Sequence, residues 1–142
     1  MERKIVHVVG TGTIGEPLIG ILSEQKSNLG IDEVTFHKQS PLTKDAPKIK
    51  NLMAKGARLS VHEDRVESFK EIGLEPEFTM EEAVSRSSVV IDCTPKGFVH
   101  KNKLDFYEKY ADKVKGFLSQ GSEDGFGKKY ARGINDHVIN SE

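Results

Sequence analysis

The sequence has one cysteine, almost no net charge and no long apolar run, and each absence excludes a class of protein. With Cys93 alone among 142 residues, the chain has no partner for an internal disulfide, which predicts a reducing, cytoplasmic compartment. A net charge of -1 argues against nucleic acid or another polyanion as a partner. No apolar run approaches the length of a membrane span, and the first residues do not resemble a signal peptide. We therefore expect no membrane contact.

The order of strand-like and helix-like runs predicts one α/β domain over residues 1–142. Apolar runs typical of strands lie at residues 4–9, 33–37, 59–62, 89–93 and 114–119. Patterns of helical period lie at residues 14–25, 43–55, 65–72, 79–86 and 103–110. Because strands alternate with helices, we expect a Rossmann-type, doubly wound sheet that is mostly parallel and has helices on both faces.

A glycine-rich turn joins the first strand-like run to the first helical pattern, with the sequence Gly10-Thr11-Gly12-Thr13-Ile14-Gly15. In this setting the first glycine permits a tight turn, and the second lets backbone N–H groups approach a pyrophosphate. The third lets the helix pack closely on the strand, and the helix N-terminus adds partial positive charge. The motif predicts a dinucleotide site. An ordinary glycine-rich turn is the alternative interpretation.

The end of the second strand-like run predicts which dinucleotide is preferred. A carboxylate at this point would accept a hydrogen bond from the ribose 2′-OH of NAD. The chain has Lys38, Gln39 and Ser40 here instead, a cation and two hydrogen-bonding groups that suit the 2′-phosphate of NADP. We therefore expect NADP as the preferred cofactor and NAD as the second. For the lysines after Lys44, a solvated helix face explains the sequence equally well.

Four segments should meet at the edge of the sheet where the strands end. Parallel sheets bind their ligands beyond the carboxyl ends of the strands. Residues 10–15, 37–40, 94–97 and 120–123 each follow a strand-like run. The sequence thus predicts one crevice lined by these four segments.

Four motifs together resemble the nucleotide-binding portion of archaeal-type (type II) glyceraldehyde-3-phosphate dehydrogenase. The glycine turn is the least specific of them. The others are Lys38-Gln39-Ser40-Pro41, the segment Val90-Ile91-Asp92-Cys93-Thr94-Pro95-Lys96-Gly97, and a stretch from Asn102 through Tyr107-Glu108-Lys109 and Lys115 to Gln120-Gly121-Ser122-Glu123. The resemblance covers most of the chain and becomes weaker after Glu123.

The resemblance implies a role for each motif. It implies a homo-oligomeric enzyme that oxidises glyceraldehyde 3-phosphate to 1,3-bisphosphoglycerate with inorganic phosphate and NADP or NAD. Within the cofactor site, the glycine turn would hold the pyrophosphate, and the segment after the second strand would lie near the adenosine ribose. The remaining motifs would flank the adenine and the nicotinamide ribose. The implied cofactor-binding residues are Gly10, Thr11, Gly12, Thr13, Ile14, Gly15, Lys38, Gln39, Ser40, Thr94, Pro95, Lys96, Gln120 and Gly121.

The chain also departs from the family pattern. Val9 stands where the family often has Asn, Glu16 where it often has a basic residue, and Ser122 where glycine is frequent. The Ser-Cys-Asn-Thr motif that carries the family's nucleophile is absent, and Cys93 belongs to the nucleotide side, where a small apolar filler is the expected role. We therefore expect no catalytic residue, no metal ligand and no catalytic domain in this chain.

Two other functions remain open on the sequence. The nucleotide domain of a semialdehyde or homoserine dehydrogenase would share the fold and the glycine turn. A non-catalytic NAD(P)-sensing module would explain the missing nucleophile. The Gln120-Gly121-Ser122-Glu123 turn favours glyceraldehyde-3-phosphate dehydrogenase over the other two dehydrogenases.

Overall fold

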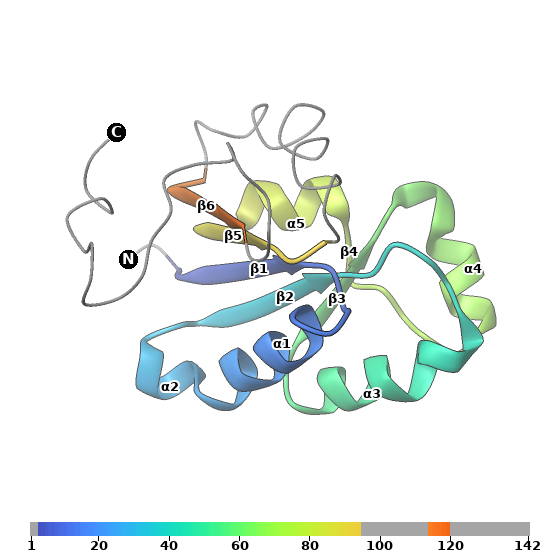
Figure 1. Cartoon of the computed structure of the whole chain (residues 1–142). Coiled ribbons are helices and arrows are strands. Elements are labelled where there is room, and N and C mark those ends of the chain that lie inside the picture. Colours follow the sequence, from blue (N-terminus) through green and yellow to red (C-terminus); the bar gives the residue numbers. More distant parts are fainter. Residues whose placement is uncertain (1–2, 95–113, 120–142) are drawn as a thin grey trace.

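A six-stranded sheet, parallel in every pairing, forms the centre of the molecule in the computed structural model, which describes residues 3–94 and 114–119 (Figure 1). The strand order is β4-β3-β2-β1-β5-β6. The strands are β1 (Ile5–Val9), β2 (Glu33–His37), β3 (Arg58–Val61), β4 (Phe78–Thr79), β5 (Val89–Asp92) and β6 (Gly116–Ser119). This arrangement confirms the predicted Rossmann-type fold.

Helices cover both faces of the sheet, with α1 and α3 on one side and α5 on the other (Figure 1). The helices are α1 (Gly15–Glu24), α2 (Lys26–Leu29), α3 (Ala46–Ala54), α4 (Val66–Glu71) and α5 (Met80–Arg86), and two short 3-10 turns are η1 (Thr43–Asp45) and η2 (Glu63–Arg65). The helix predicted at residues 43–55 is divided between η1 and α3. Pro47 lies in the first turn of α3, where its missing N–H costs no helical hydrogen bond.

Two apolar cores lie on the two faces of the sheet because successive strand residues point to opposite sides. Val8 of β1 belongs to the larger core, with Ile19 of α1 and Ile49 of α3. Its neighbour Val9 belongs to the smaller core, with Val84 of α5. Each face therefore buries apolar surface against its own helices.

One stretch of the sheet face that α5 covers is polar. Glu33, Thr35 and His37 of β2 alternate with Val34 and Phe36, and all five are buried. Their register partners continue the polar row, since Thr35 lies opposite His7 of β1 and His37 opposite Ser60 of β3. His7 Nδ1 lies 2.7 Å from Thr35 Oγ1, and His37 Nδ1 lies 3.3 Å from Ser60 Oγ.

The sequence predicted most elements but missed two short ones, α2 and β4. Thr79 ends β4 and caps α5: its hydroxyl accepts from the Glu82 N–H, and the Glu82 carboxylate accepts from the Thr79 N–H. The helix predicted at residues 103–110 lies outside the described residues.

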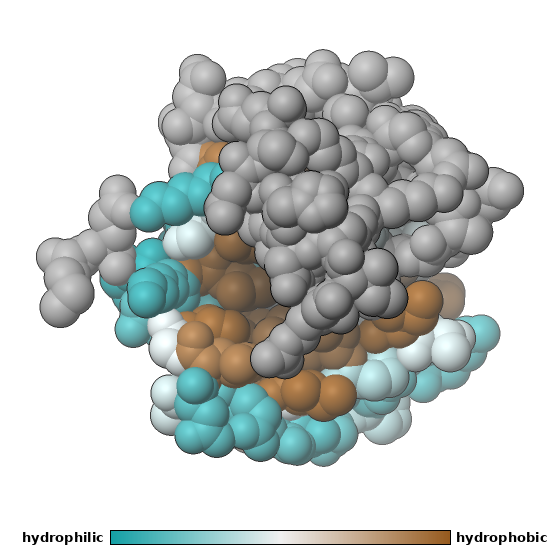
Figure 2. Space-filling view, turned by 60° about the vertical axis from the view of Figure 1, so that its left-hand side comes forward, coloured by the Kyte–Doolittle hydropathy of each residue, from teal (hydrophilic) through white to brown (hydrophobic). Residues whose placement is uncertain are grey.

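The described surface includes exposed apolar side chains. Ile14 and Ile21 at α1 and Leu29 of α2 are each between 44% and 57% exposed. Figure 2 shows a face on which apolar residues border hydrophilic ones. Within the described residues, no helix has both the length and the apolar character needed to cross a lipid bilayer.

Candidate nucleotide-binding site

A topological switch point of the sheet lies between β1 and β5. From β1 the chain adds β2, β3 and β4 on one side, and it then returns to add β5 and β6 on the other. Open α/β sheets bind ligands beyond the carboxyl ends of the strands at such a point. The glycine turn follows β1 here, and Cys93 and Thr94 follow β5.

Gly10 and Gly15 are required by close packing. Gly10 has φ +104°, and a Cβ on it would lie 3.1 Å from the Cys93 carbonyl carbon and 3.2 Å from the Thr94 nitrogen. A Cβ on Gly15 would lie 2.0 Å from the Gly10 carbonyl oxygen. Both positions therefore need glycine to bring the turn, α1 and the end of β5 together, as the motif predicted.

Gly12 is different, because a Cβ built on it meets nothing within 4 Å. The space beside its backbone is open. Among the described residues, the N–H groups of Thr11, Gly12 and Thr13 have no backbone acceptor. They lie just before the N-terminus of α1, where the helix dipole favours an anion. The turn thus fits the pyrophosphate of a dinucleotide.

The end of β2 adjoins the glycine turn, since the Gly10 N–H donates to the His37 carbonyl at 3.3 Å. Lys38 follows, and its Nζ lies 3.1 Å from Asp45 Oδ2. Gln39 is exposed, and its carbonyl accepts from Arg65 Nη1 at 2.8 Å. Ser40 follows it in the same loop. The predicted ribose-binding residues therefore lie together beside the turn, but Lys38 already has an anionic partner.

Lys48 is a residue of this region whose position the sequence did not predict. From α3, its Nζ donates to the Thr11 carbonyl at 2.9 Å. It also lies 3.9 Å from a carboxylate oxygen of Glu16 and 3.9 Å from one of Asp45. The Glu16 carboxylate, which follows the glycine turn directly, therefore has a cation beside it. The only sequence signal was the Asp45–Lys48 spacing of three residues in a helical segment.

At the end of β5, Asp92 holds Thr94 in place. Asp92 is fully buried, and its Oδ1 accepts from the Thr94 N–H at 2.9 Å and from the Thr94 hydroxyl. Between them, Cys93 is buried, and burial together with the Asp92 charge raises the pKa of its thiol to about 11. The predicted residues Pro95, Lys96, Gln120 and Gly121 lie outside the described residues.

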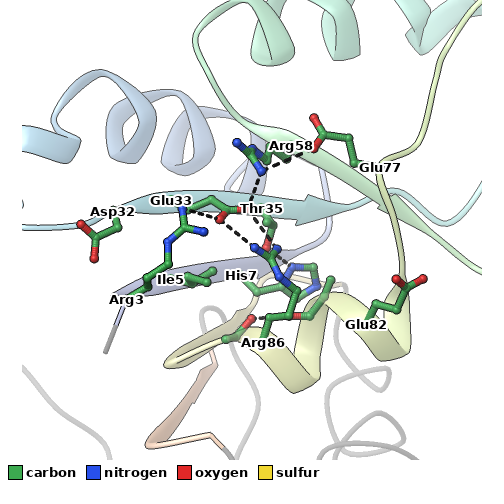
Figure 3. Close-up of polar contacts among 12 residues, drawn as sticks. Arg3, Ile5, His7, Asp32, Glu33, Thr35, Arg58, Glu77, Glu82 and Arg86 are labelled. Atoms are coloured by element: carbon green, nitrogen blue, oxygen red, sulfur yellow. Dashed lines mark hydrogen bonds and ion pairs between the residues drawn. The ribbon is translucent and has the colours of Figure 1, made fainter. Parts of the chain in front are cut away.

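A second polar cluster lies at the amino ends of the strands, on the side of the sheet opposite the glycine turn. It surrounds Glu33, the first residue of β2 (Figure 3). Its carboxylate contacts Arg3 at 3.2 Å, Arg58 at 3.4 Å and Arg86 at 2.9 Å. Burial opposes ionisation of Glu33, but the Arg86 hydrogen bonds and the three arginine charges lower its pKa below the usual value. Within residues 3–94 and 114–119, His, Cys, Asp and Glu side chains form no group of three suited to a metal ion.

The sequence of the chain is similar to the sequences of enzymes from archaea. No family model matches the chain. It is 34% identical over 129 residues to glyceraldehyde-3-phosphate dehydrogenase of Methanopyrus kandleri, 36% over 109 residues to that of Methanobacterium formicicum, and 29% over 121 residues to that of Pyrobaculum islandicum. These matches cover 87%, 75% and 84% of the chain, but only 34%, 30% and 32% of the relatives. The chain therefore belongs to the family of archaeal glyceraldehyde-3-phosphate dehydrogenases, of whose length it spans about a third.

Proposed function

We propose that this chain binds a nicotinamide dinucleotide at the carboxyl edge of the sheet, between β1 and β5. The observation that carries the proposal is the turn itself: Gly10 and Gly15 pack closely, a Cβ on Gly12 would meet nothing within 4 Å, and the N–H groups of residues 11–13 have no backbone acceptor among the described residues. Backbone N–H groups at a helix N-terminus suit a pyrophosphate. The names of the relatives support a nicotinamide cofactor.

We also propose a reaction for a full-length enzyme of this family that contains such a chain. That reaction is the oxidation of glyceraldehyde 3-phosphate, with inorganic phosphate, to 1,3-bisphosphoglycerate. The dinucleotide, when bound, accepts a hydride from the substrate. The residues of this chain bind and orient it: residues 10–15 hold the pyrophosphate, Lys38 to Ser40 the adenosine ribose, and Thr94 the adenine side. Pro95 and Lys96 would continue the adenine side, and Gln120 and Gly121 would approach the nicotinamide ribose.

We further propose that NADP binds more tightly than NAD. Lys38 gives the 2′-phosphate a charge-assisted contact, and no carboxylate follows β2 directly to receive a 2′-OH. Such a hydrogen bond contributes roughly 1.5–3 kcal/mol, and solvent and salt reduce it toward the lower value. We expect a preference of about tenfold.

Titration calorimetry of both dinucleotides tests these proposals. We expect Gly12→Val to weaken both at least about tenfold without unfolding the chain, because its side chain would occupy the open space beside the turn. Gly116→Val is the matched control. A Cβ there also meets nothing within 4 Å, but Gly116 is the first residue of β6 and lies at the end of the strands opposite the glycine turn. Equal binding by both variants, or no binding by the unmodified chain, would contradict the dinucleotide site.

A further inference from the structure

Lys38 and Asp45 form the most enclosed ion pair beside the glycine turn. Their side chains are only 12% and 19% exposed, and the Lys38 Nζ lies 3.1 Å from Asp45 Oδ2. Asp45 is the one acid between residues 37 and 58 of the sequence. Partial burial opposes its ionisation, but the hydrogen bond and charge of Lys38, with the charges of Lys48 and Lys44, lower the pKa of Asp45 below its usual value. The carboxylate is therefore ionised at neutral pH.

This pair changes what Lys38 can offer to a nucleotide. A free ammonium beside the ribose would favour a 2′-phosphate strongly, whereas one already neutralised favours it less. The phosphate would have to displace the Asp45 carboxylate from Lys38 or share the ammonium with it at close range. Two anions that share one cation repel each other, and the repulsion is strong where solvent screens poorly. NAD, which has a 2′-hydroxyl, meets no such repulsion.

The structure also connects Asp45 to the phosphate end of the site. Its second carboxylate oxygen lies 3.9 Å from Lys48 Nζ, and Lys48 in turn donates to the Thr11 carbonyl. Asp45 is the last residue of η1 and directly precedes α3, so these two helical segments fix the position of its backbone. Two lysines that face the site therefore share this one carboxylate.

We propose that Asp45 is a specificity-determining residue, which limits the preference for NADP by neutralising Lys38. The proposal rests on the dinucleotide site proposed above. It assigns a role to a residue outside the glycine motif and outside the segment directly after β2. Removing the carboxylate should release Lys38 for the 2′-phosphate and should hardly change the affinity for NAD.

The test compares Asp45→Asn with the unmodified chain, using titrations of NADP and NAD. A simpler pair of probes is 2′,5′-ADP and 5′-AMP, which differ only in the 2′-phosphate. We expect Asp45→Asn to raise the ratio of NADP to NAD affinity about tenfold above that of the unmodified chain, because the 2′-phosphate no longer shares Lys38 with a carboxylate. The ratio for the two smaller probes should change by a similar factor. Added salt should reduce both effects.

Three further variants make the result specific. Glu75→Gln removes the same charge from an exposed position between α4 and β4 and should leave the ratio unchanged. In a Lys38→Met background, Asp45→Asn should lose most of its effect, because the two residues act as a pair. Asp45→Ser repeats the test with a smaller side chain. Thermal unfolding of each variant establishes that it is folded.

The outcomes separate this inference from the proposed function. If the unmodified chain binds neither dinucleotide, the proposed site is wrong and the role of Asp45 is wrong with it. If it binds both, but the folded Asp45→Asn and Asp45→Ser variants leave the ratio within twofold of the original, Asp45 does not determine specificity. An equal gain for NAD and NADP would also overturn the inference, because it would indicate a general charge effect.

Discussion

Glu33 and Arg86 form a two-pronged ion pair, in which Nη1 and Nη2 of the arginine lie 3.0 and 2.9 Å from the two carboxylate oxygens (Figure 3). Glu33 begins β2 and its side chain is 3% exposed, whereas Arg86 is the last residue of α5. The Arg86 guanidinium also lies over the Phe78 ring, 4.1 Å from its centroid. Arg86 therefore connects α5 to β2 through Glu33 and to β4 through Phe78, away from the glycine turn.

We expect Glu33→Gln to lower the free energy of unfolding by about 2–3 kcal/mol. The variant leaves the guanidinium groups of Arg3, Arg58 and Arg86 without their shared counter-charge. Breaking a fully buried pair costs about 3–5 kcal/mol, and the partial exposure of the arginines reduces this cost. Urea unfolding at neutral pH measures the change.

Glu67→Gln is the control for that measurement. Glu67 is 86% exposed and 3.7 Å from Lys70, so its loss should change stability by less than about 0.5 kcal/mol. Dinucleotide affinity should be the same in folded Glu33→Gln as in the unmodified chain, because the cluster is remote from the site. Equal stability of the two variants would show that the Glu33 cluster contributes little.

The buried histidines predict a loss of stability in mild acid. Burial lowers the pKa of His7 to about 3, and burial together with nearby positive charges lowers that of His37. Below pH 6.5 the unfolded chain binds protons at these positions that the folded chain does not bind, so acid favours unfolding. His7 alone should remove about 2 kcal/mol between pH 7.5 and pH 5.

Urea unfolding at several pH values tests this effect. His7→Asn keeps a polar atom near the position of Nδ1, where it can contact the Thr35 hydroxyl, and it has no group that titrates in this range. Its stability should therefore depend less on pH than that of the unmodified chain. Identical pH profiles would mean that His7 accepts a proton in the folded state at ordinary pH.

The fold was largely predictable because its signals are local. The alternation of strand-like and helical runs gave the parallel sheet, and Thr79 with the following acids marked the start of α5. The strand β4 has two residues and α2 has four, too few for a periodic pattern to be visible. The polar row of His7, Thr35 and His37 was also not predicted, because it depends on register between strands.

The site was predictable only where a motif fixes the backbone. Gly10, Gly12 and Gly15 have the packing and openness that the motif implies. Lys38 directly follows β2, where the sequence placed it, but its pairing with Asp45 depends on how α3 returns toward β2. Lys48 contacts the turn across 37 residues of sequence, and its identity gives no hint of that contact.

Gly15→Ala should destabilise the chain by about 3 kcal/mol or more. The added Cβ would lie 2.0 Å from the Gly10 carbonyl oxygen, and backbone at the start of α1 has little freedom to move. Gly116→Ala, where the added Cβ has open space, should change stability by less than about 0.5 kcal/mol. Comparable melting temperatures for the two variants would mean that the turn can relax.

The Cys93 thiol should react slowly and should not support catalysis. With a pKa of about 11, roughly 0.1% of it is thiolate at pH 8, far below the fraction for an exposed thiol. We expect alkylation by iodoacetamide at pH 8, followed by mass spectrometry, to be at least about 100-fold slower than for the same chain in urea. The chain alone should not oxidise glyceraldehyde 3-phosphate. Turnover that is lost in Cys93→Ala would contradict this.

Lys48 should contribute to the affinity for NAD and NADP alike, because the pyrophosphate is common to both. Its Nζ lies at the glycine turn, donating to the Thr11 carbonyl, and it offsets the Glu16 carboxylate. We expect Lys48→Met to weaken both dinucleotides about three- to tenfold and to reduce the salt dependence of binding. The ratio of the two affinities should remain nearly constant, in contrast to the variants of Asp45.

Lys50→Met provides the matched control on the same helix. It removes the same charge from an exposed position two residues away, where the side chain approaches Gly73 rather than the turn. Its effect on either dinucleotide should be less than about twofold, since the charge is solvated. If Lys50→Met weakens binding as much as Lys48→Met, the general positive charge of α3 attracts the nucleotide. If only NADP affinity falls in Lys48→Met, Lys48 faces the 2′-phosphate instead of the pyrophosphate.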